Sequence, residues 1–247
     1  MKKICVITDN EFLYGKLKRI IEGAEYSGYQ FDFYYSENNK AFQNKYKGCE
    51  SFQPINLKAM EDSFYRQYHV FLSLHCKQMF PEKLVGCYRC INVHPGYNPY
   101  NRGWFPQVFS ILNKKPAGVT IHEMDRELDH GPVICQEYIE IQPYDTSWDV
   151  YQRIQQKEAD MLEVYLANLL EGNYNRSAMP MEGNVNSKAD FEKLCKIDLG
   201  RAATYGEVID FLRATTFDAY DNAYFLDQDG NRVYVSISLK REAGSGK

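Results

Sequence analysis

The stretch at residues 90–106 reads CINVHPGYNPYNRGWFP and differs from the sequence on either side of it. The apolar residues within 88–94 predict a β-strand, and the Pro95-Gly96 pair predicts its end. Because side chains alternate along a strand, Asn92 and His94 would share one face. They would stand at the carboxyl end of the strand, where α/β sheets bind their ligands. The loop that follows is crowded with Asn, Tyr, Arg and Trp, a composition typical of a binding surface.

The sequence outward from this stretch alternates between strand and helix patterns. Further strands are predicted at 3–8, 29–35, 69–75, 117–124 and 131–141, and helices at 11–23, 103–113, 146–171 and 205–215. For the longest helix we expect Thr146 or Ser147 as the N-cap and Gly172 as the C-cap. Such alternation predicts an α/β fold built on a mainly parallel sheet.

The last third of the chain has a different character. Residues 172–204 are polar and without clear periodicity, and residues 222–239 hold two strand-like runs around Asp229-Gly230, which predicts a β-hairpin. We therefore expect a catalytic core at 1–180, a linker at 181–204 and a small C-terminal α+β region at 205–247.

Composition excludes several classes of protein. The chain has 247 residues, 25% of them charged and 44% hydrophobic, which is typical of a globular protein. The net charge of −4 does not favour nucleic acid as a partner. No run of 18 apolar residues predicts a membrane span, and with no signal-peptide pattern the seven cysteines indicate reduced thiols in the cytoplasm. The first strand is not followed by G-x-G-x-x-G, and Walker A, H-E-x-x-H and G-x-S-x-G are absent too.

A second polar segment comes about 35 residues after His94. Asp129-His130-Gly131 forms a predicted loop between two apolar strands, so its carboxylate could approach His94 and orient the ring. His122 and His130 flank this loop, and we expect structural roles for both. Cys87 and Cys90 with His94 have partial zinc-site spacing, but Cys87 would not share the strand face of the other two. No metal is therefore expected.

Asn92-Val93-His94-Pro95, combined with the Asp-x-Gly-Pro loop at 129–132, resembles the N10-formyltetrahydrofolate-dependent formyltransferases. The segments LHCKQMFP at 74–81 and GVTIHEMD at 118–125, together with HPGYNPYNRGWFPQ, resemble one branch of that family. This branch is the bacterial dTDP-4-amino-4,6-dideoxyhexose N-formyltransferases, with the dTDP-4-amino-4,6-dideoxyglucose enzymes as the nearest type. The general family has H-P-S-L-L-P where this chain has H-P-G-Y-N-P. The resemblance covers residues 3–170 and implies a Rossmann-like formyltransferase core.

The resemblance implies that Asn92, His94 and Asp129 are the catalytic residues. An amine attacks the formyl carbon in this chemistry, and hydrogen-bond donors must meet the negative charge that develops on the oxygen. Asn92 and His94 can donate to that oxygen, and Asp129 can fix the tautomer of His94. Whether His94 or Asp129 takes the proton of the amine is left open.

The resemblance also implies two ligand sites. The folate would lie against two loops formed by Gln78, Met79, Phe80, Pro81, Leu84, Met124, Asp125 and Arg126. The sugar nucleotide would be bound by Asn10, His75, Lys77, Gln78, Tyr97, Tyr100, Arg102, Trp104 and Tyr224. Simpler structural explanations exist for Lys77 as a surface lysine, for Trp104 as packing at a helix start and for Tyr224 as core.

The implied function is transfer of a formyl group from N10-formyltetrahydrofolate to a dTDP-linked amino-dideoxyhexose. We expect the product to serve O-antigen, lipopolysaccharide or other surface-glycan biosynthesis, and the enzyme to be a cytoplasmic homodimer without nucleic-acid or membrane partners. Alternatives are another amine substrate (a dTDP-3-amino sugar, glycinamide ribonucleotide or methionyl-tRNA), a non-catalytic sugar-nucleotide binding module, and a metal-dependent protein.

Overall fold

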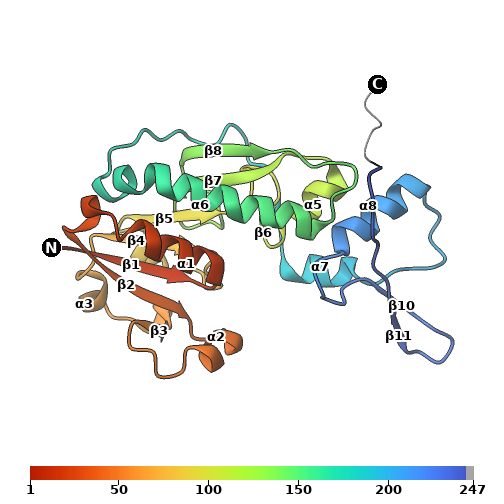
Figure 1. Cartoon of the computed structure of the whole chain (residues 1–247), viewed down its shortest axis with the longest axis horizontal. Helices are drawn as coiled ribbons and strands as arrows, with labels where there is room; N and C mark the ends of the chain where they lie inside the picture. The colour runs from red at the N-terminus through yellow and green to blue at the C-terminus, as the bar shows by residue number, and fades with distance from the viewer. Residues whose placement is uncertain (243–247) are drawn as a thin grey trace.

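The computed structural model describes residues 1–242 and is organised around one seven-stranded sheet (Figure 1). Its strand order is β3-β2-β1-β4-β5-β7-β8. The strands are β1 (Lys2–Thr8), β2 (Tyr29–Ser36), β3 (Phe52–Ile55), β4 (Val70–Leu74), β5 (Cys90–His94), β7 (Ala117–Glu123) and β8 (Val133–Ile139). The first five strands pair in parallel, whereas β7 runs antiparallel to both β5 and β8. The predicted mainly parallel α/β sheet is confirmed.

The strand that carries Asn92 and His94 lies inside the sheet. All five residues of β5 are buried, as are all five of β4, because neighbours cover both faces of these strands. Parallel pairing with β4 and antiparallel pairing with β7 place the ends of three strands around His94. Main-chain atoms at that point are therefore held by hydrogen bonds on both sides.

One long helix, α6 (Ser147–Glu171), runs across the sheet beside α1 (Glu11–Ile20) (Figure 1). The Thr146 hydroxyl accepts from the Asp149 amide and the Asp149 carboxylate accepts from Thr146, which makes a reciprocal cap. Gly172 ends the helix in the left-handed conformation. Both predicted caps are confirmed.

The C-terminal region attaches to the core through α5 (Pro106–Asn113), which packs against α8 (Tyr205–Thr215). Beyond α8, β10 (Tyr224–Leu226) and β11 (Arg232–Tyr234) form the predicted antiparallel hairpin. Residues 188–194 were expected to be irregular, and this was wrong: α7 (Lys188–Leu194) begins there with a reciprocal cap between Ser187 and Asp190. The proposed division into core, linker and C-terminal region remains a prediction.

Smaller differences concern the ends of elements. The strand β5 starts two residues later than expected, because the Tyr88 amide still bonds the Leu84 carbonyl of the preceding helical turn. Helix α5 starts at Pro106 instead of residue 103, because Phe105 has a left-handed backbone. Several short elements were not anticipated: β3, α2 (Lys40–Lys45), α3 (Asp62–Tyr65), α4 (Glu82–Val85), β6 (Arg102–Gly103) and β9 (Val185–Asn186). Within residues 1–242, no helix combines the length and apolarity that a membrane span requires.

Candidate active site

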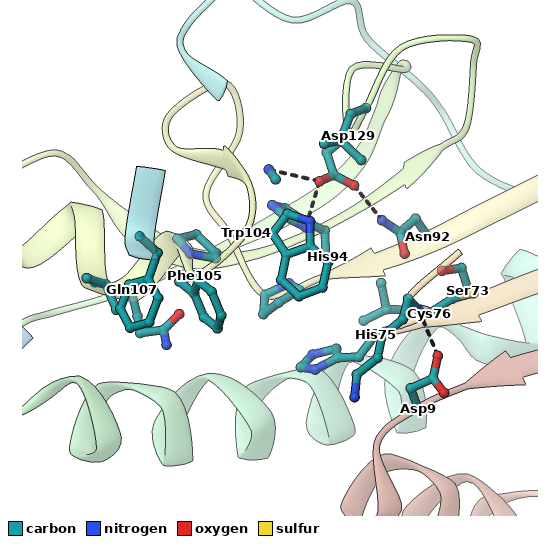
Figure 2. A pocket seen from close by; sticks show the side chains of 18 of the residues that line it. Asp9, Ser73, His75, Cys76, Asn92, His94, Trp104, Phe105, Gln107 and Asp129 are labelled. Carbon is teal, nitrogen blue, oxygen red and sulfur yellow. Dashed lines mark hydrogen bonds and ion pairs between the residues drawn. The ribbon is translucent and has the colours of Figure 1, made fainter. Parts of the chain in front are cut away.

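A cavity of about 570 Å³ opens at the carboxyl ends of β4 and β5. One wall comes from the loop after β5 and the loop that contains Asp129. The opposite wall comes from α6 and from residues 214–222, so that core and C-terminal region enclose the cavity together. Figure 2 shows Asn92, His94 and Asp129 grouped on one side, with His75 and Cys76 facing them from the end of β4.

The three predicted catalytic residues meet in this cavity. The Asn92 amide donates to Asp129 Oδ1 over 2.9 Å, and His94 Nδ1 lies 3.4 Å from Asp129 Oδ2 (Figure 2). The amide of Gly103 donates to Asp129 Oδ2 over 3.1 Å. Asp129 has a positive φ of 49°, a conformation that turns its side chain back toward the sheet. Residues 37 positions apart in the sequence are thus brought into one polar cluster.

His122 completes this cluster, although only a structural role was expected for it. Its Nδ1 donates to the Glu123 carbonyl over 2.7 Å, which leaves Nε2 as an acceptor 3.3 Å from the Asn92 amide nitrogen. Both N–H bonds of Asn92 are therefore directed at His122 and Asp129. To donate to a formyl oxygen, Asn92 must release one of these two partners when substrate enters.

The protonation states of His94 and Asp129 follow from their surroundings. Burial lowers the pKa of His94 to about 4, outweighing the opposing effect of the Asp129 carboxylate. Burial would by itself raise the pKa of Asp129, but His94, His122 and the Gly103 amide together lower it to about 2. At pH 7 the cluster therefore contains a neutral imidazole beside an ionised carboxylate. Such a carboxylate favours the tautomer with the proton on Nδ1, and His94 Nε2 then carries a lone pair.

His94 lines the cavity, and its buried Nε2 lies beside Gly96 without a hydrogen-bond partner among the described residues. A buried nitrogen with a free lone pair is costly in a core, but it can accept a proton from a bound amine. Gly96 leaves the room this atom needs: a β-carbon at that position would lie 2.3 Å from Nε2.

Residues 183–186, which belong to the predicted linker and which we call the strap, hold the loop after β5. The two residues of β9 pair in parallel with β6, and the main chain of residues 99–104 bonds that of residues 184–186. Gly183 crosses this loop so closely that a β-carbon there would lie 1.9 Å from the Pro99 carbonyl oxygen. Asn98 adds a bond from its side chain to the Asp129 carbonyl over 2.8 Å. The loop after β5 is thus fixed by residues distant in the sequence.

The two predicted folate loops lie next to each other. Met124 packs against the buried cluster that contains Phe80 and Leu84, and Arg126 makes an ion pair with Glu82 across 2.9 Å. Of the eight residues assigned to the folate, the cavity is lined by Gln78, Met79, Phe80, Met124 and Asp125. Pro81, Leu84 and Arg126 stand behind or beside this lining.

Four of the nine residues assigned to the sugar nucleotide line the cavity, one lies behind this lining and four make contacts elsewhere. His75, Lys77, Gln78 and Trp104 line the cavity. Asn10 lies behind His75, at 3.2 Å from its ring. The other four make contacts elsewhere: Tyr97 with Tyr138, Tyr100 with Lys115, Arg102 with Glu182, and Tyr224 with Arg232.

For three of these four residues, contacts with nearby groups explain why the side chain does not line the cavity. The Tyr97 ring passes over Gly118, where the missing side chain leaves space. Arg102 is 2% exposed and its guanidinium bonds the Leu128 carbonyl and Glu182, so it supports the Asp129 loop. Tyr224 belongs to β10, where the guanidinium of Arg232 covers its ring at 4.4 Å.

A group of aromatic side chains borders the cavity instead, and we call it the aromatic wall. Tyr151 from α6 and Phe217 and Tyr220 from beyond α8 line the cavity, and Trp148 packs on Phe217 with ring centres 5.0 Å apart. Tyr151 and Trp148 fall within the predicted helix stripe, which by itself indicates only core packing. Their position in a cavity depends on where α8 ends.

The partial zinc pattern does not assemble. Cys87 is exposed whereas Cys90 is buried, and all seven cysteines are free thiols. Among residues 1–242, the one group of three potential metal ligands is Glu127, His130 and Glu182, in which both carboxylates are exposed. Exposed acidic groups of this kind are common without an ion.

Comparison with known proteins gives matches along most of the chain. Residues 38–166 match the family model described as "Formyl transferase", and residues 190–241 match the "N-formyltransferase dimerization C-terminal domain". A dTDP-4-amino-4,6-dideoxyglucose formyltransferase of Mycobacterium bovis is 46% identical over 176 residues, which is 71% of this chain and 75% of that protein.

Two solved structures are similar over nearly the whole length. A 4-N formyltransferase from Francisella tularensis has a TM-score of 0.92 and 42% identity, covering 98% of this chain and 99% of the other. A sugar N-formyltransferase from Shewanella sp. FDAARGOS_354 has a TM-score of 0.93 and 39% identity, covering 98% and 100%.

Proposed function

The chain belongs to the formyl transferase family, and from this premise we propose that it uses N10-formyltetrahydrofolate to formylate a dTDP-linked amino-dideoxyhexose. It is an N-formyltransferase that acts on a dTDP-amino sugar, as its similarity to the Mycobacterium bovis and Francisella tularensis proteins indicates. The observation that carries the proposal is the meeting of Asn92, His94 and Asp129 in one cavity. The substrate we favour is dTDP-4-amino-4,6-dideoxyglucose.

The proposed reaction assigns one role to each of the three residues. His94, neutral and with a free Nε2, takes a proton from the attacking nitrogen as the tetrahedral intermediate forms. The Asn92 amide turns one N–H toward the developing oxyanion, an interaction typically worth about 10²–10³ in rate. Asp129 stays ionised and stabilises the imidazolium that His94 becomes. The proton then passes from His94 to N10 of the departing folate.

We assign the two ligands to opposite parts of the cavity. The folate occupies the side lined by residues 78–80 and by residues of the 124–128 segment. Lys77 is exposed at the cavity and lies at the end of β4, which suits a pyrophosphate. The aromatic wall of Trp148, Tyr151, Phe217 and Tyr220 offers flat surfaces for the thymine or the hexose.

We further propose that the enzyme is a homodimer formed through its C-terminal region. Apolar side chains are exposed along α8 and the hairpin, including Tyr205 at 90%, Val208 at 43% and Leu226 at 42%. An exposed apolar surface of this kind is typical of an interface. The matched C-terminal family model is also described as a dimerization domain.

The cellular setting belongs to the same proposal. Seven free thiols are typical of a reducing compartment, which agrees with a cytoplasmic enzyme that makes a precursor for O-antigen, lipopolysaccharide or another surface glycan. A tRNA substrate is disfavoured by the net charge of −4. In sequence, the matched methionyl-tRNA formyltransferases align over only part of the chain, for example 137 residues in the Lactobacillus johnsonii protein.

The decisive experiment is incubation of the purified protein with N10-formyltetrahydrofolate and a panel of dTDP-3-amino and dTDP-4-amino sugars. We expect mass spectrometry to show the gain of one formyl group on dTDP-4-amino-4,6-dideoxyglucose. The His94→Asn variant should bind the nucleotide and turn over orders of magnitude more slowly. If no dTDP-4-amino sugar gains a formyl group, the proposal is wrong.

A further inference from the structure

A second histidine–carboxylate pair borders the cavity, and the reaction described above does not use it. Glu158 on α6 is completely buried, and both of its carboxylate oxygens lie 2.8 Å from Nε2 of His75. Within residues 1–242 this imidazole is the carboxylate's one polar partner. The His75 side chain is 11% exposed and lines the cavity, so the pair connects a buried charge to the ligand space.

The orientation of the His75 ring follows from Asn10, the N-cap of α1. Asn10 Oδ1 accepts from the Leu13 amide over 3.0 Å, so its Nδ2 must face the other way. That Nδ2 lies 3.2 Å from His75 Nδ1 and 3.2 Å from the Tyr151 hydroxyl. Because Nδ2 can only donate, His75 Nδ1 is an acceptor and the ring proton is on Nε2, directed at Glu158.

Tyr151 connects this pair with the cavity. Its hydroxyl accepts from Asn10 and lies 3.4 Å from His75 Nδ1, so the Tyr151 hydroxyl and the Asn10 amide share the single lone pair of that nitrogen. Tyr151 lines the cavity as His75 does. A group that contacts the Tyr151 oxygen therefore reaches His75 through one hydroxyl.

The His75–Glu158 pair contains a buried carboxylate that no cation among residues 1–242 compensates when the imidazole is neutral. A fully buried carboxylate is expensive unless a cation compensates it, and a neutral imidazole does not. Burial accordingly raises the pKa of Glu158, against the opposing influence of His75. A proton added to His75 would convert the site into an ion pair with no net charge. The positive φ of His75, 55°, shows that the backbone holds the ring in this place although the conformation is unfavourable for a residue with a β-carbon.

Formyl transfer creates a need for such a proton acceptor. The nitrogen that attacks loses one proton and N10 of the folate gains one, and His94 can carry that proton between them. An alkyl amine is largely an ammonium at pH 7, however, and its additional proton must leave before attack because an ammonium has no lone pair. His94 cannot hold both protons.

On the basis of the proposed function, we propose that the His75–Glu158 pair accepts this additional proton through Tyr151. An N–H bond of the substrate ammonium breaks, its electron pair stays on nitrogen, and the proton bonds to the Tyr151 oxygen. In the same step the original Tyr151 proton moves to His75 Nδ1. The imidazolium then faces the Glu158 carboxylate, and the neutral amine is free to attack. Glu158 acts through His75 and is a positioning residue.

Other charged and titratable groups surround the pair and set its response to pH. They come from the loop after β1, the loop after β4, strand β5, the Asp129 loop and the segment beyond α8. The cavity-lining members are Asp9, Cys76, Lys77, His94, Asp125, Glu127, Asp129 and Tyr220. Asp9 is occupied by bonds from Ser36, Asn39 and the Lys77 amide. His94 is neutral at pH 7 for the reasons given above. Within the described chain, the Glu158 carboxylate is the group bonded directly to the His75 ring that can compensate an imidazolium.

The test is the pH dependence of kcat/KM for dTDP-4-amino-4,6-dideoxyglucose with saturating N10-formyltetrahydrofolate, between pH 6 and pH 9.5. For Glu158→Gln we expect a loss of about 10²-fold at pH 7, within the range for removal of a proton acceptor. The loss should shrink to about threefold at pH 9.5, where the substrate amine is already neutral in solution. Tyr151→Phe keeps the His75–Glu158 pair but removes the connecting hydroxyl, and it should show the same recovery.

Glu163→Gln, an exposed position on the same helix, is the matched control and should follow the wild type at every pH. A loss that is equal at all pH values in both Glu158→Gln and Tyr151→Phe would overturn the inference and leave only a structural pair. Wild-type activity at pH 7 in both variants would overturn it too. If Glu158→Gln does not fold, Tyr151→Phe decides alone. Absence of turnover by the wild type at any pH would instead contradict the proposed function.

Discussion

Replacing Gly96 by alanine should disable the enzyme without unfolding it. The β-carbon that the substitution adds would lie 2.3 Å from His94 Nε2 and 2.8 Å from its Cδ2. Ordinary contact between carbon and nitrogen needs about 3.5 Å, so one of the two groups must move by about 1 Å. Gly96 is not among the residues with positive φ, and alanine is therefore compatible with its backbone. The steric clash of the added β-carbon is therefore with the His94 imidazole alone.

The expected loss of rate follows from the size of this displacement of the His94 ring. His94 is 3% exposed and already lies 3.4 Å from Asp129, so the ring has little free space into which it can turn. Misplacing a reacting group by about 1 Å costs about 10²-fold in rate, which corresponds to about 3 kcal/mol in the activation free energy. Because Gly96 is assigned no ligand contact, KM for the sugar nucleotide should change by less than about threefold.

The assay is steady-state formylation of dTDP-4-amino-4,6-dideoxyglucose, with the thermal midpoint measured in parallel. Gly15→Ala is the matched control, because a β-carbon there meets nothing within 4 Å in the middle of α1. That control should keep full activity and gain about 0.5–1 kcal/mol in unfolding free energy. A Gly96→Ala enzyme with wild-type kcat would refute the reasoning, since His94 Nε2 would then not be the atom that acts.

Three further outcomes are expected. Asp129→Asn should lower kcat by at least about 10²-fold. The folded pKa of Asp129 is depressed to about 2, so the ionised carboxylate stabilises the folded protein above pH 4. This stabilisation disappears as the pH falls toward 2. Urea unfolding at pH 7, 5 and 3 should therefore show the stability difference between wild type and variant shrinking by about 1 kcal/mol between pH 5 and pH 3. Gly183→Ala should destabilise more than Gly48→Ala in thermal melts, because both have positive φ but only Gly183 would clash, with the Pro99 carbonyl; equal losses would rule out a tight strap. Val208→Asp on the exposed face of α8 should shift the protein from dimer to monomer in light scattering at unchanged secondary structure, and a monomeric wild type would contradict the assigned interface.

The main features of the fold could be read from local patterns. The strand runs that became β1, β4 and β5, and the long stripe of α6, have the periods of buried elements, so their type depends little on the rest of the chain. Short elements such as α7 escaped detection because seven residues hold no complete apolar stripe. Their formation depends on a cap and on packing against distant residues.

The proposed catalytic residues could be identified from the sequence because Asn92 and His94 lie on one strand, at a spacing of two residues that places both on the same face of any sheet. Asp129 followed from a loop between two predictable strands. The role of His122 was missed, since it becomes visible only when antiparallel pairing sets His122 opposite Asn92. Register between strands is decided by the whole sheet, and no local pattern contains it.

The sequence by itself thus determined the α/β class, the strand that holds the proposed reacting groups and the chemistry proposed for them. Tertiary structure alone decided which side chains enclose the cavity. Tyr224 was a candidate because of the family resemblance, yet the guanidinium of Arg232 covers its ring within the hairpin. Glu158 was one of many charges on a long helix, yet packing of α6 against the sheet buries it beside His75. The physical reason is that burial and contact arise from segments far apart in the chain, whereas sequence patterns report only the preferences of neighbours.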